Sequence, residues 1–174
     1  MAMSVEAQVV ASPNLREFLL PTYYVDCDSP AIKDFVSRVA GDEQRRSATD
    51  KAIRLFNAVR DQIRYDPYAV SLSEADYRAS EILKMPSAFC VPKAILLAAA
   101  MRAAGIPAAI GFADVRNHLN SAKLTELMGT DLFIYHGYVA LWLDGNMFKV
   151  TPAFNMELCE RFGVRPLIFD GTAD

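Results

Sequence analysis

The chain has 174 residues, of which 52% are hydrophobic and 22% charged, and its formal net charge is -3. This length and composition predict a single domain with its own hydrophobic core and no need for a disulfide framework. The mildly acidic balance, with no basic run longer than Arg45-Arg46, excludes the strongly basic class of nucleic-acid-binding proteins.

The N-terminal part predicts an arm followed by a helix. Residues up to about Tyr24 alternate weakly between apolar and polar, which fits either an edge strand or an arm laid over the core. Ser29 followed by Pro30 is typical of a helix start, because serine caps the free N–H groups and proline is tolerated in the first turn. We expect this helix to end at about Ala40, before Gly41.

A second helix is predicted to follow Ser47, which forms a capping-box pattern with Asp50. Four apolar residues fall on one face of this helix: Ile53, Phe56, Val59 and Ile63. The opposite side carries Arg54, Arg60 and Asp61, which we interpret as a solvated face. The helix breaks before Pro67, and a polar loop leads to a short helical piece over Ala79–Lys84.

The most apolar segment of the chain predicts a buried central helix. It runs through Ala94–Met101, a stretch rich in good helix formers but too short to span a bilayer. Pro92 marks the first turn, and Gly105 followed by Pro107 marks the end. Cys90 therefore lies at the helix N-terminus, where free N–H groups and the helix dipole stabilise a thiolate.

The rest of the chain predicts an antiparallel sheet. Ala108–Val115 reads as a strand, and a short helix is expected over Ser121–Met128. The clearest hairpin pairs Leu132–Leu143 with Met147–Val150 around the turn residues 144–146. Together these elements predict an α+β fold in which the central helix packs against the sheet.

The C-terminal segment predicts one more helix. Asn155 can cap Met156–Phe162, which ends at Gly163, and Pro166–Phe169 is expected to add an edge strand.

Local chemistry separates the three cysteines as candidate nucleophiles. Cys27 lies between Asp26 and Asp28, whose charges oppose thiolate formation. Cys159 lies in a short apolar helix, where a core role is the ordinary one. Only Cys90 has a helix N-terminus. The odd number of cysteines suits a reducing compartment and argues against a disulfide scaffold or a multi-cysteine zinc site.

Of the two histidines, His136 is the better candidate for a base. It lies on a predicted strand, and Gly137 leaves room either for a substrate or for the helix that carries Cys90 to approach. His118 lies in a polar loop segment, for which a surface or supporting role is expected. With two histidines and no marked carboxylate spacing, the sequence predicts no metal centre and no cofactor.

These residues resemble the bacterial transglutaminase-like superfamily, whose members share a papain-like cysteine-enzyme fold. The segments that carry the resemblance are Cys90, Lys93-Ala94, Arg102–Ala108, His136–Val139 and Leu143–Gly145. The likeness covers about residues 47–163, and residues 1–46 precede it as the arm and first helix of one domain, 1–174.

The resemblance implies a cysteine nucleophile, a histidine base and an aspartate that orients the histidine. Cys90 and His136 match the first two positions. The position of the aspartate holds Thr151, before Pro152, whose hydroxyl can accept the imidazole N–H but stabilises imidazolium less than a carboxylate does. Asn155 is an alternative orienting residue, although helix capping is its expected role.

The sequence therefore predicts a cysteine-dependent acyl hydrolase or acyltransferase. Its substrate would be a peptide or another acyl donor, an amide, ester or thioester, attacked by Cys90 to form an acyl-enzyme. Two alternatives stay open: a non-catalytic binding module that has lost the acid of its triad, and a structural α/β domain without a site. The chain starts with neither a basic n-region nor an apolar h-region and is expected to be cytoplasmic, with no membrane partner.

Overall fold

The computed structural model describes residues 14–41, 46–116, 126, 129 and 132–172. The predicted helix over 121–128 falls almost wholly outside this part of the chain, as do His118 and the weakly alternating residues 7–11.

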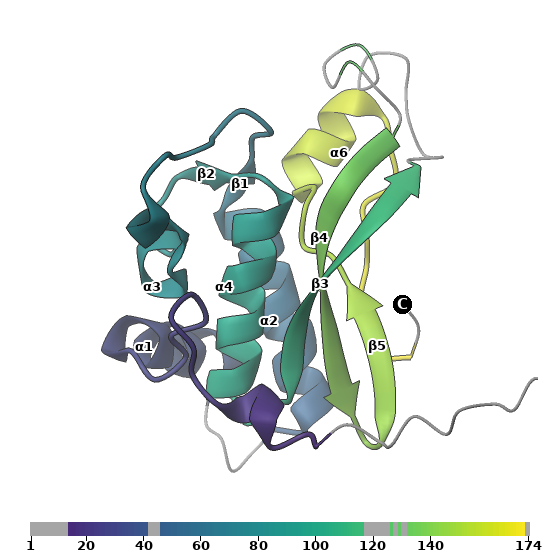
Figure 1. Cartoon of the computed structure of the whole chain (residues 1–174). Coiled ribbons are helices and arrows are strands. Elements are labelled where there is room, and N and C mark those ends of the chain that lie inside the picture. The colour runs from purple at the N-terminus through teal and green to yellow at the C-terminus, as the bar shows by residue number, and fades with distance from the viewer. Residues whose placement is uncertain (1–13, 42–45, 117–125, 127–128, 130–131, 173–174) are drawn as a thin grey trace, which may run out of the picture.

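Helices and a small antiparallel sheet form two layers (Figure 1). The elements are η1 (Glu17–Leu19), α1 (Pro30–Ala40), α2 (Ala48–Gln62), β1 (Arg64–Tyr65), η2 (Glu74–Tyr77), α3 (Ala79–Ile82), β2 (Ser87–Ala88), α4 (Cys90–Ala103), β3 (Ala108–Arg116), β4 (Leu132–Leu143), β5 (Asn146–Val150) and α6 (Met156–Phe162). The sheet has the order β3-β4-β5 with antiparallel pairing, and β1 and β2 form a separate parallel pair. The α+β architecture predicted from the sequence is confirmed.

Helix α4 is the centre of the core. It contacts α1, α2 and α3 on one side and β3 and β4 on the other. The whole run from Ala94 to Met101 is buried, with exposed fractions of 0 to 6%. A helix that is apolar on every side is stable only when it is covered on every side, which explains why the strongest hydrophobic segment takes this place. The chain enters α4 through β2, so Cys90 is its first helical residue.

The predicted starts of the first two long helices are confirmed. The Ser29 hydroxyl accepts the N–H of Ile32 at the start of α1, and the Ser47 hydroxyl accepts the N–H of Asp50 at 3.1 Å at the start of α2. Each cap satisfies a first-turn donor that has no partner within its helix. The caps therefore fix where these helices begin.

A buried lysine joins α4 to the end of α2. Lys93 is fully buried, and its Nζ donates hydrogen bonds to the backbone carbonyls of Arg60, at 2.8 Å, and Ile63. Carbonyl groups in the last turn of a helix lack intrahelical partners, and a cation is favourable there. Burial nevertheless lowers the Lys93 pKa to about 7; the carboxylate of Asp61 opposes this shift.

The second helix corrects one prediction from the sequence. Arg54 and Asp61 fall on the outer side, but Arg60 is buried, with 6% of its surface exposed. Its guanidinium makes a two-point ion pair with Asp61 and donates to the carbonyl of Leu167 at 2.8 Å. The prediction was wrong because that acceptor lies 107 residues further along the chain.

The β4-β5 hairpin has a two-residue turn. Asp144 and Gly145 both have positive φ, 49° and 81°, as a tight turn between twisted strands requires. Asn146, predicted to belong to the turn, pairs with Leu143 and begins β5. In the neighbouring pair, Gly137 on β4 lies opposite Phe112 on β3.

Both ends of the described chain close over the core. Near the N-terminus, the ring of Phe18 stacks on Trp142 of β4 with 4.9 Å between centroids, so this segment is an arm rather than an edge strand. The expected edge strand over Pro166–Phe169 does not form. Instead, Phe169 is 2% exposed and packs edge-on against Phe56 and Phe148.

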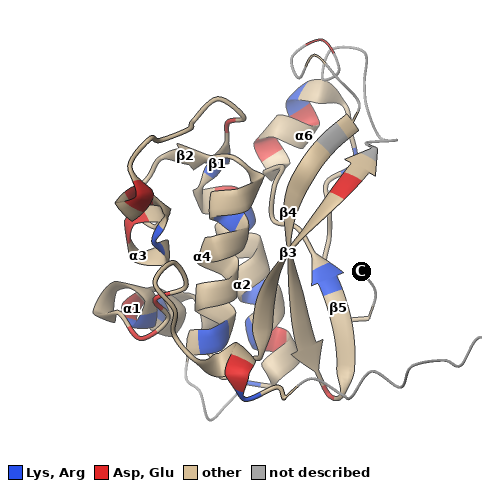
Figure 2. Cartoon of the chain, viewed as in Figure 1, with Lys and Arg blue, Asp and Glu red and all other residues tan. Residues whose placement is uncertain are grey.

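Charged residues of both signs are distributed over this fold. Figure 2 shows Lys and Arg interspersed with Asp and Glu over the described helices and strands. Within the part of the chain that the structure describes, we find no helix that is long and apolar enough to cross a bilayer.

Candidate active site

Cys90 lies at the first position of α4, and its side chain is half-buried. Burial raises the pKa of the Cys90 thiol, whereas the backbone N–H groups of Gly137, Val91 and Cys90 itself lower it. Burial prevails, so the pKa lies above the ordinary value of 9.0. The N–H groups nevertheless form a set of donors around the sulfur, ready to stabilise negative charge when it develops.

Gly137 brings the strand that carries His136 against the first turn of α4. A Cβ placed on Gly137 would stand 2.9 Å from Cα of Val91 and 3.3 Å from its backbone nitrogen. Real Cβ atoms do not approach backbone so closely, so only glycine permits this packing. Of the two roles expected for Gly137 from the sequence, the close approach of the Cys90 helix is the one observed.

His136 is held by the hydroxyl of Thr151, which follows β5. His136 is 7% exposed, and its Nε2 lies 2.9 Å from Thr151 Oγ1. The same hydroxyl donates its single proton to the carbonyl of Gly137 at 3.2 Å. A hydroxyl has only one proton to donate, so Thr151 must accept from Nε2–H. In the neutral imidazole this tautomer leaves Nδ1 as the basic nitrogen.

The side chains of Cys90 and His136 are both neutral near pH 7. Burial lowers the pKa of His136 below its ordinary 6.5, and burial raises that of Cys90. The two shifts thus favour a neutral thiol and a neutral imidazole over a thiolate and an imidazolium.

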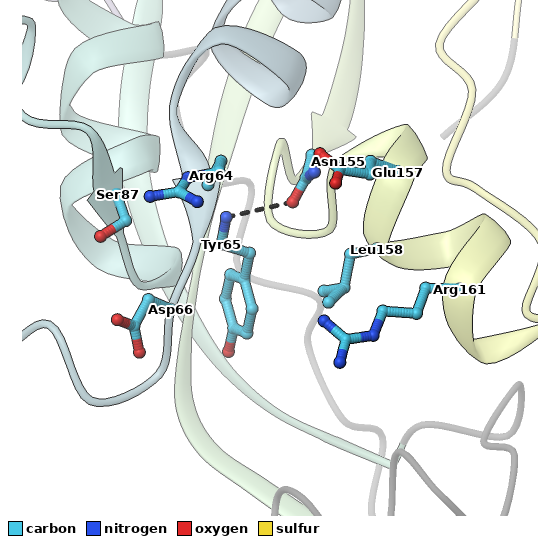
Figure 3. A pocket seen from close by; sticks show the side chains of 8 residues that line it. All are labelled: Arg64, Tyr65, Asp66, Ser87, Asn155, Glu157, Leu158 and Arg161. Atoms are coloured by element: carbon cyan, nitrogen blue, oxygen red, sulfur yellow. Dashed lines mark hydrogen bonds between the residues drawn. The ribbon is translucent and has the colours of Figure 1, made fainter.

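A polar pocket lies between the β1-β2 pair and α6 (Figure 3). Its volume is about 240 Å³, and its lining residues are Arg64, Tyr65, Asp66, Ser87, Asn155, Glu157, Leu158 and Arg161. Burial is the main cause of the raised pKa of Tyr65, and the charges of Cys90 and Asp66 add to it. Ser87, which lines the pocket, lies on β2 three residues before Cys90.

The comparisons with known proteins decide the family. Residues 33–152 match the family model described as the transglutaminase-like superfamily. This chain belongs to the transglutaminase-like superfamily. The match includes Cys90, His136 and Thr151.

Two solved structures share the fold of this transglutaminase-like chain. One is described as a "Putative Cysteine Protease" from Cytophaga hutchinsonii, with a TM-score of 0.62 and 18% identity over 84% of this chain and 45% of that one. The other is the periplasmic domain of TgpA from Pseudomonas aeruginosa, with a TM-score of 0.53 and 18% identity over 79% of this chain and 46% of that one. The chain thus spans less than half the length of either. No curated protein matches.

Asn155 has a different role in this transglutaminase-like domain from the capping role predicted for it. It occupies the N-cap position of α6, but its side chain makes no capping hydrogen bond. Its Oδ1 instead accepts the N–H of Tyr65 at 3.1 Å, as Figure 3 shows, and Asp61 accepts the N–H of Met156 at the helix start. The prediction failed because both interactions join parts of the chain about 90 residues apart.

The other two cysteines are part of the packed interior. Cys27 and Cys159 are 5% and 1% exposed, and burial raises the pKa of each. For Cys27, burial rather than its acidic neighbours is the main cause. Among the described residues no group of three or more His, Cys, Asp and Glu side chains is arranged to hold a metal ion.

Two features of this transglutaminase-like site were missed by sequence reasoning. The N–H of Gly137 as a donor to the sulfur depends on packing between α4 and β4, and no local pattern reports it. Tyr65 lies 25 residues before Cys90 and reaches it through the β1-β2 pairing of Tyr65 with Ala88. The only available signal was an aromatic residue just after a predicted helix.

Proposed function

We propose that this transglutaminase-like domain is a cysteine-dependent acyl hydrolase or acyltransferase that works through an acyl-enzyme on Cys90. The observation that supports the proposal is a thiol with three backbone N–H groups that lower its pKa, together with a histidine in one fixed tautomer on the strand that packs, at Gly137, against the first turn of α4. In this assignment Cys90 is the nucleophile, His136 the base, and Thr151 the residue that orients His136.

The first half of the reaction forms the acyl-enzyme. As Sγ attacks the carbonyl carbon of an amide, ester or thioester, the thiol proton passes to Nδ1 of His136, and the carbonyl electron pair moves to oxygen. The tetrahedral intermediate collapses when the bond to the leaving group breaks. His136 then gives its proton to the departing nitrogen, oxygen or sulfur, so the imidazole returns to neutral.

The second half releases the acyl group to water or to an amine. His136 accepts a proton from the attacking molecule, a new C–O or C–N bond forms, and the thioester C–S bond breaks. The proton then returns to the sulfur, which restores the resting thiol and imidazole. Water as acceptor gives hydrolysis, and an amine gives acyl transfer.

Backbone donors supply the electrostatic part of the proposal. The N–H of Cys90 at the free end of α4 can donate to the developing oxyanion as well as to the sulfur. One such donor is typically worth about 3 kcal/mol of transition-state stabilisation. Thr151 is a neutral acceptor and stabilises imidazolium less than a carboxylate, so we expect catalysis slower than with an aspartate at this position.

A test follows acylation directly. The full chain is mixed with p-nitrophenyl acetate, and a burst of nitrophenol is measured together with the mass of the intact protein. We expect one acetyl group on Cys90, no adduct in Cys90→Ala, and a rate at least about 100-fold lower in His136→Ala. Cys159→Ala is the matched control and should acylate normally. An unmodified wild-type protein would contradict the proposal and favour the non-catalytic binding module.

A second measurement separates hydrolysis from transfer. Decay of the acetyl-enzyme is followed in buffer and with added butylamine or hydroxylamine, and products are identified by mass. A decay rate that rises with amine concentration, together with the N-acetyl product, assigns acyl transfer. A decay rate independent of amine assigns hydrolysis.

A further inference from the structure

We infer that an apolar pocket beside Cys90 is the subsite for a large apolar side chain, aromatic or branched, of a peptide acyl donor. This inference rests on the proposed function for the position of the reacting carbonyl. The pocket itself is a separate observation. Its volume is about 410 Å³, and its lining residues are Tyr24, Tyr77, Val91, Ile95, Ile110 and Phe112.

The pocket is joined to the nucleophile through both chain neighbours of Cys90. Val91 lines the pocket and also packs against Gly137, next to His136. On the other side, the ring of Phe89 lies edge-on to Tyr77, another lining residue, with 6.3 Å between centroids. The pocket is therefore an apolar surface next to both residues that flank Cys90, within the region that a group attached to a carbonyl at Cys90 would occupy.

The two tyrosines present their rings and not their hydroxyl groups. Tyr24 donates to the carboxylate of Glu74 at 2.7 Å, and Tyr77 donates to the carbonyl of Ser71 at 3.0 Å. Both hydroxyl groups are thus hydrogen-bonded within the segment that precedes α3, one to Glu74 of η2 and the other to the loop before it. The remaining lining residues are aliphatic or phenyl, so the pocket offers a ligand no charged side chain.

The aromatic lining and the location favour a side chain over a long linear acyl chain. A volume of about 410 Å³ is within the usual range of small-molecule pockets. Three aromatic rings bound it, and aromatic groups pack favourably against rings in offset or edge-on geometry. The other pocket, between the β1-β2 pair that leads into Cys90 and α6, offers polar partners: Arg64, Asp66, Glu157 and Arg161. A peptide combines a polar main chain with an apolar side chain next to the carbonyl.

The surface exposure of two lining residues also fits a binding site. Phe112 is 55% exposed on β3, and Tyr24 is 39% exposed. Their rings form an apolar surface that a bound side chain would cover, which provides the driving force for binding.

The test compares p-nitrophenyl esters that differ only in the acyl group. The acyl groups are N-acetylglycyl, N-acetylphenylalanyl and N-acetylaspartyl, with octanoyl as the linear apolar probe. We expect the acylation rate constant per molar substrate to be at least about tenfold higher for phenylalanyl than for glycyl. Octanoyl should fall below phenylalanyl, and aspartyl should be slowest.

Two variants locate the preference. Phe112→Ser removes an exposed ring and should reduce the phenylalanyl to glycyl ratio several-fold. Met147→Ser is the matched control, since Met147 is 48% exposed on the same sheet but does not line the pocket. Its ratio should equal that of the wild-type chain. Circular dichroism melting shows that both variants are folded.

The outcomes distinguish a failure of the proposed subsite from a failure of the proposed acylation of Cys90. Equal rates for glycyl and phenylalanyl esters in a chain that acylates normally would overturn the subsite alone. A faster octanoyl than phenylalanyl ester would replace a peptide donor with a fatty acyl donor and also overturn it. If no ester acylates Cys90, binding of N-acetylphenylalaninamide to Cys90→Ala is followed by NMR. Shifts at Val91 and Ile110 that N-acetylglycinamide does not cause would support the pocket, and no shifts would refute it.

Discussion

Gly137 and Val91 are in contact, and each is the chain neighbour of a proposed catalytic residue. Because a Cβ on Gly137 would stand 2.9 Å from Cα of Val91, this glycine sets how closely β4 approaches α4. The positions of His136 and Cys90 relative to each other therefore depend on a residue with no side chain.

Gly137→Ala is expected to separate the two elements. The added methyl meets backbone rather than a flexible side chain, so we expect a loss of about 1–3 kcal/mol in the free energy of unfolding and a fall of at least tenfold in Cys90 acylation. Gly111→Ala is the control, because its Cβ would meet the ring of Tyr138 rather than the backbone of α4. It should lower stability without a comparable loss of acylation. Equal effects of both variants on acylation would contradict this account.

Thr151 variants test the orientation of His136. Thr151→Val keeps the shape but removes the acceptor for Nε2–H, so acylation should fall about 10- to 100-fold, whereas Thr151→Ser should retain most activity. Thr151→Asp adds a carboxylate, which should raise the pKa of His136. NMR titration of the imidazole and the acylation rate are the two readouts. If Thr151→Val acylates like the wild-type chain, the hydroxyl has no orienting role.

The pH dependence of Cys90 alkylation tests the neutral resting pair. Since the Cys90 pKa is raised above 9.0, its reaction with iodoacetamide should keep increasing beyond pH 9, later than that of N-acetylcysteine. Cys27 and Cys159 should react more slowly because they are buried. A rate that is already constant from pH 5 to 8 would indicate a preformed thiolate instead. Labelled peptides identified by mass spectrometry provide the measurement.

The acylation rate should fall in acid solution as His136 becomes protonated. Burial lowers the pKa of this base below 6.5, so the basic form persists into mildly acid solution, and acylation by p-nitrophenyl acetate should begin to fall only below pH 6.5. A fall that is complete by pH 7 would contradict the lowered pKa. Thr151→Asp should move this limit to higher pH.

Because Lys93 is buried, its contribution to the free energy of unfolding should depend on pH. Its pKa is about 7 in the folded chain and about 10.5 when unfolded, so between these values the unfolded state binds the additional proton. The free energy of unfolding of the wild-type chain should thus rise with pH relative to Lys93→Met, by at most about 1.4 kcal/mol per pH unit. Urea unfolding at pH 7, 8.5 and 10 measures the difference. A constant difference would show that Lys93 keeps its charge when buried.

Local signals account for the parts of the fold that the sequence predicted well. Ser29 and Ser47 cap their helices within three residues, and the hairpin turn depends on Asp144 and Gly145 alone. The central helix followed from an uninterrupted apolar run that only complete burial can satisfy. These are short-range or compositional features, and they need no knowledge of distant partners.

Long-range partners account for the errors. Arg60 was expected on the surface because its acceptor, the Leu167 carbonyl, is far along the chain, and Asn155 was expected to cap α6 although Tyr65 takes its oxygen. For the site, Thr151 was named from a resemblance, but the hydroxyl proton that defines the His136 tautomer is directed by the carbonyl of Gly137. Such hydrogen bonds can be identified only when the distant segments that they join have been placed in the fold.

The described tail after α6 has a consequence for how fragments of this chain would behave. Secondary structure ends at Phe162, yet Leu167 supplies the acceptor for Arg60, and Phe169 fills the space between Phe56 and Phe148. A fragment cut at Gly163 would keep every described helix and strand but leave a cavity and a buried guanidinium with one acceptor fewer. Expression boundaries and protease resistance should therefore be set by this irregular segment rather than by the last helix.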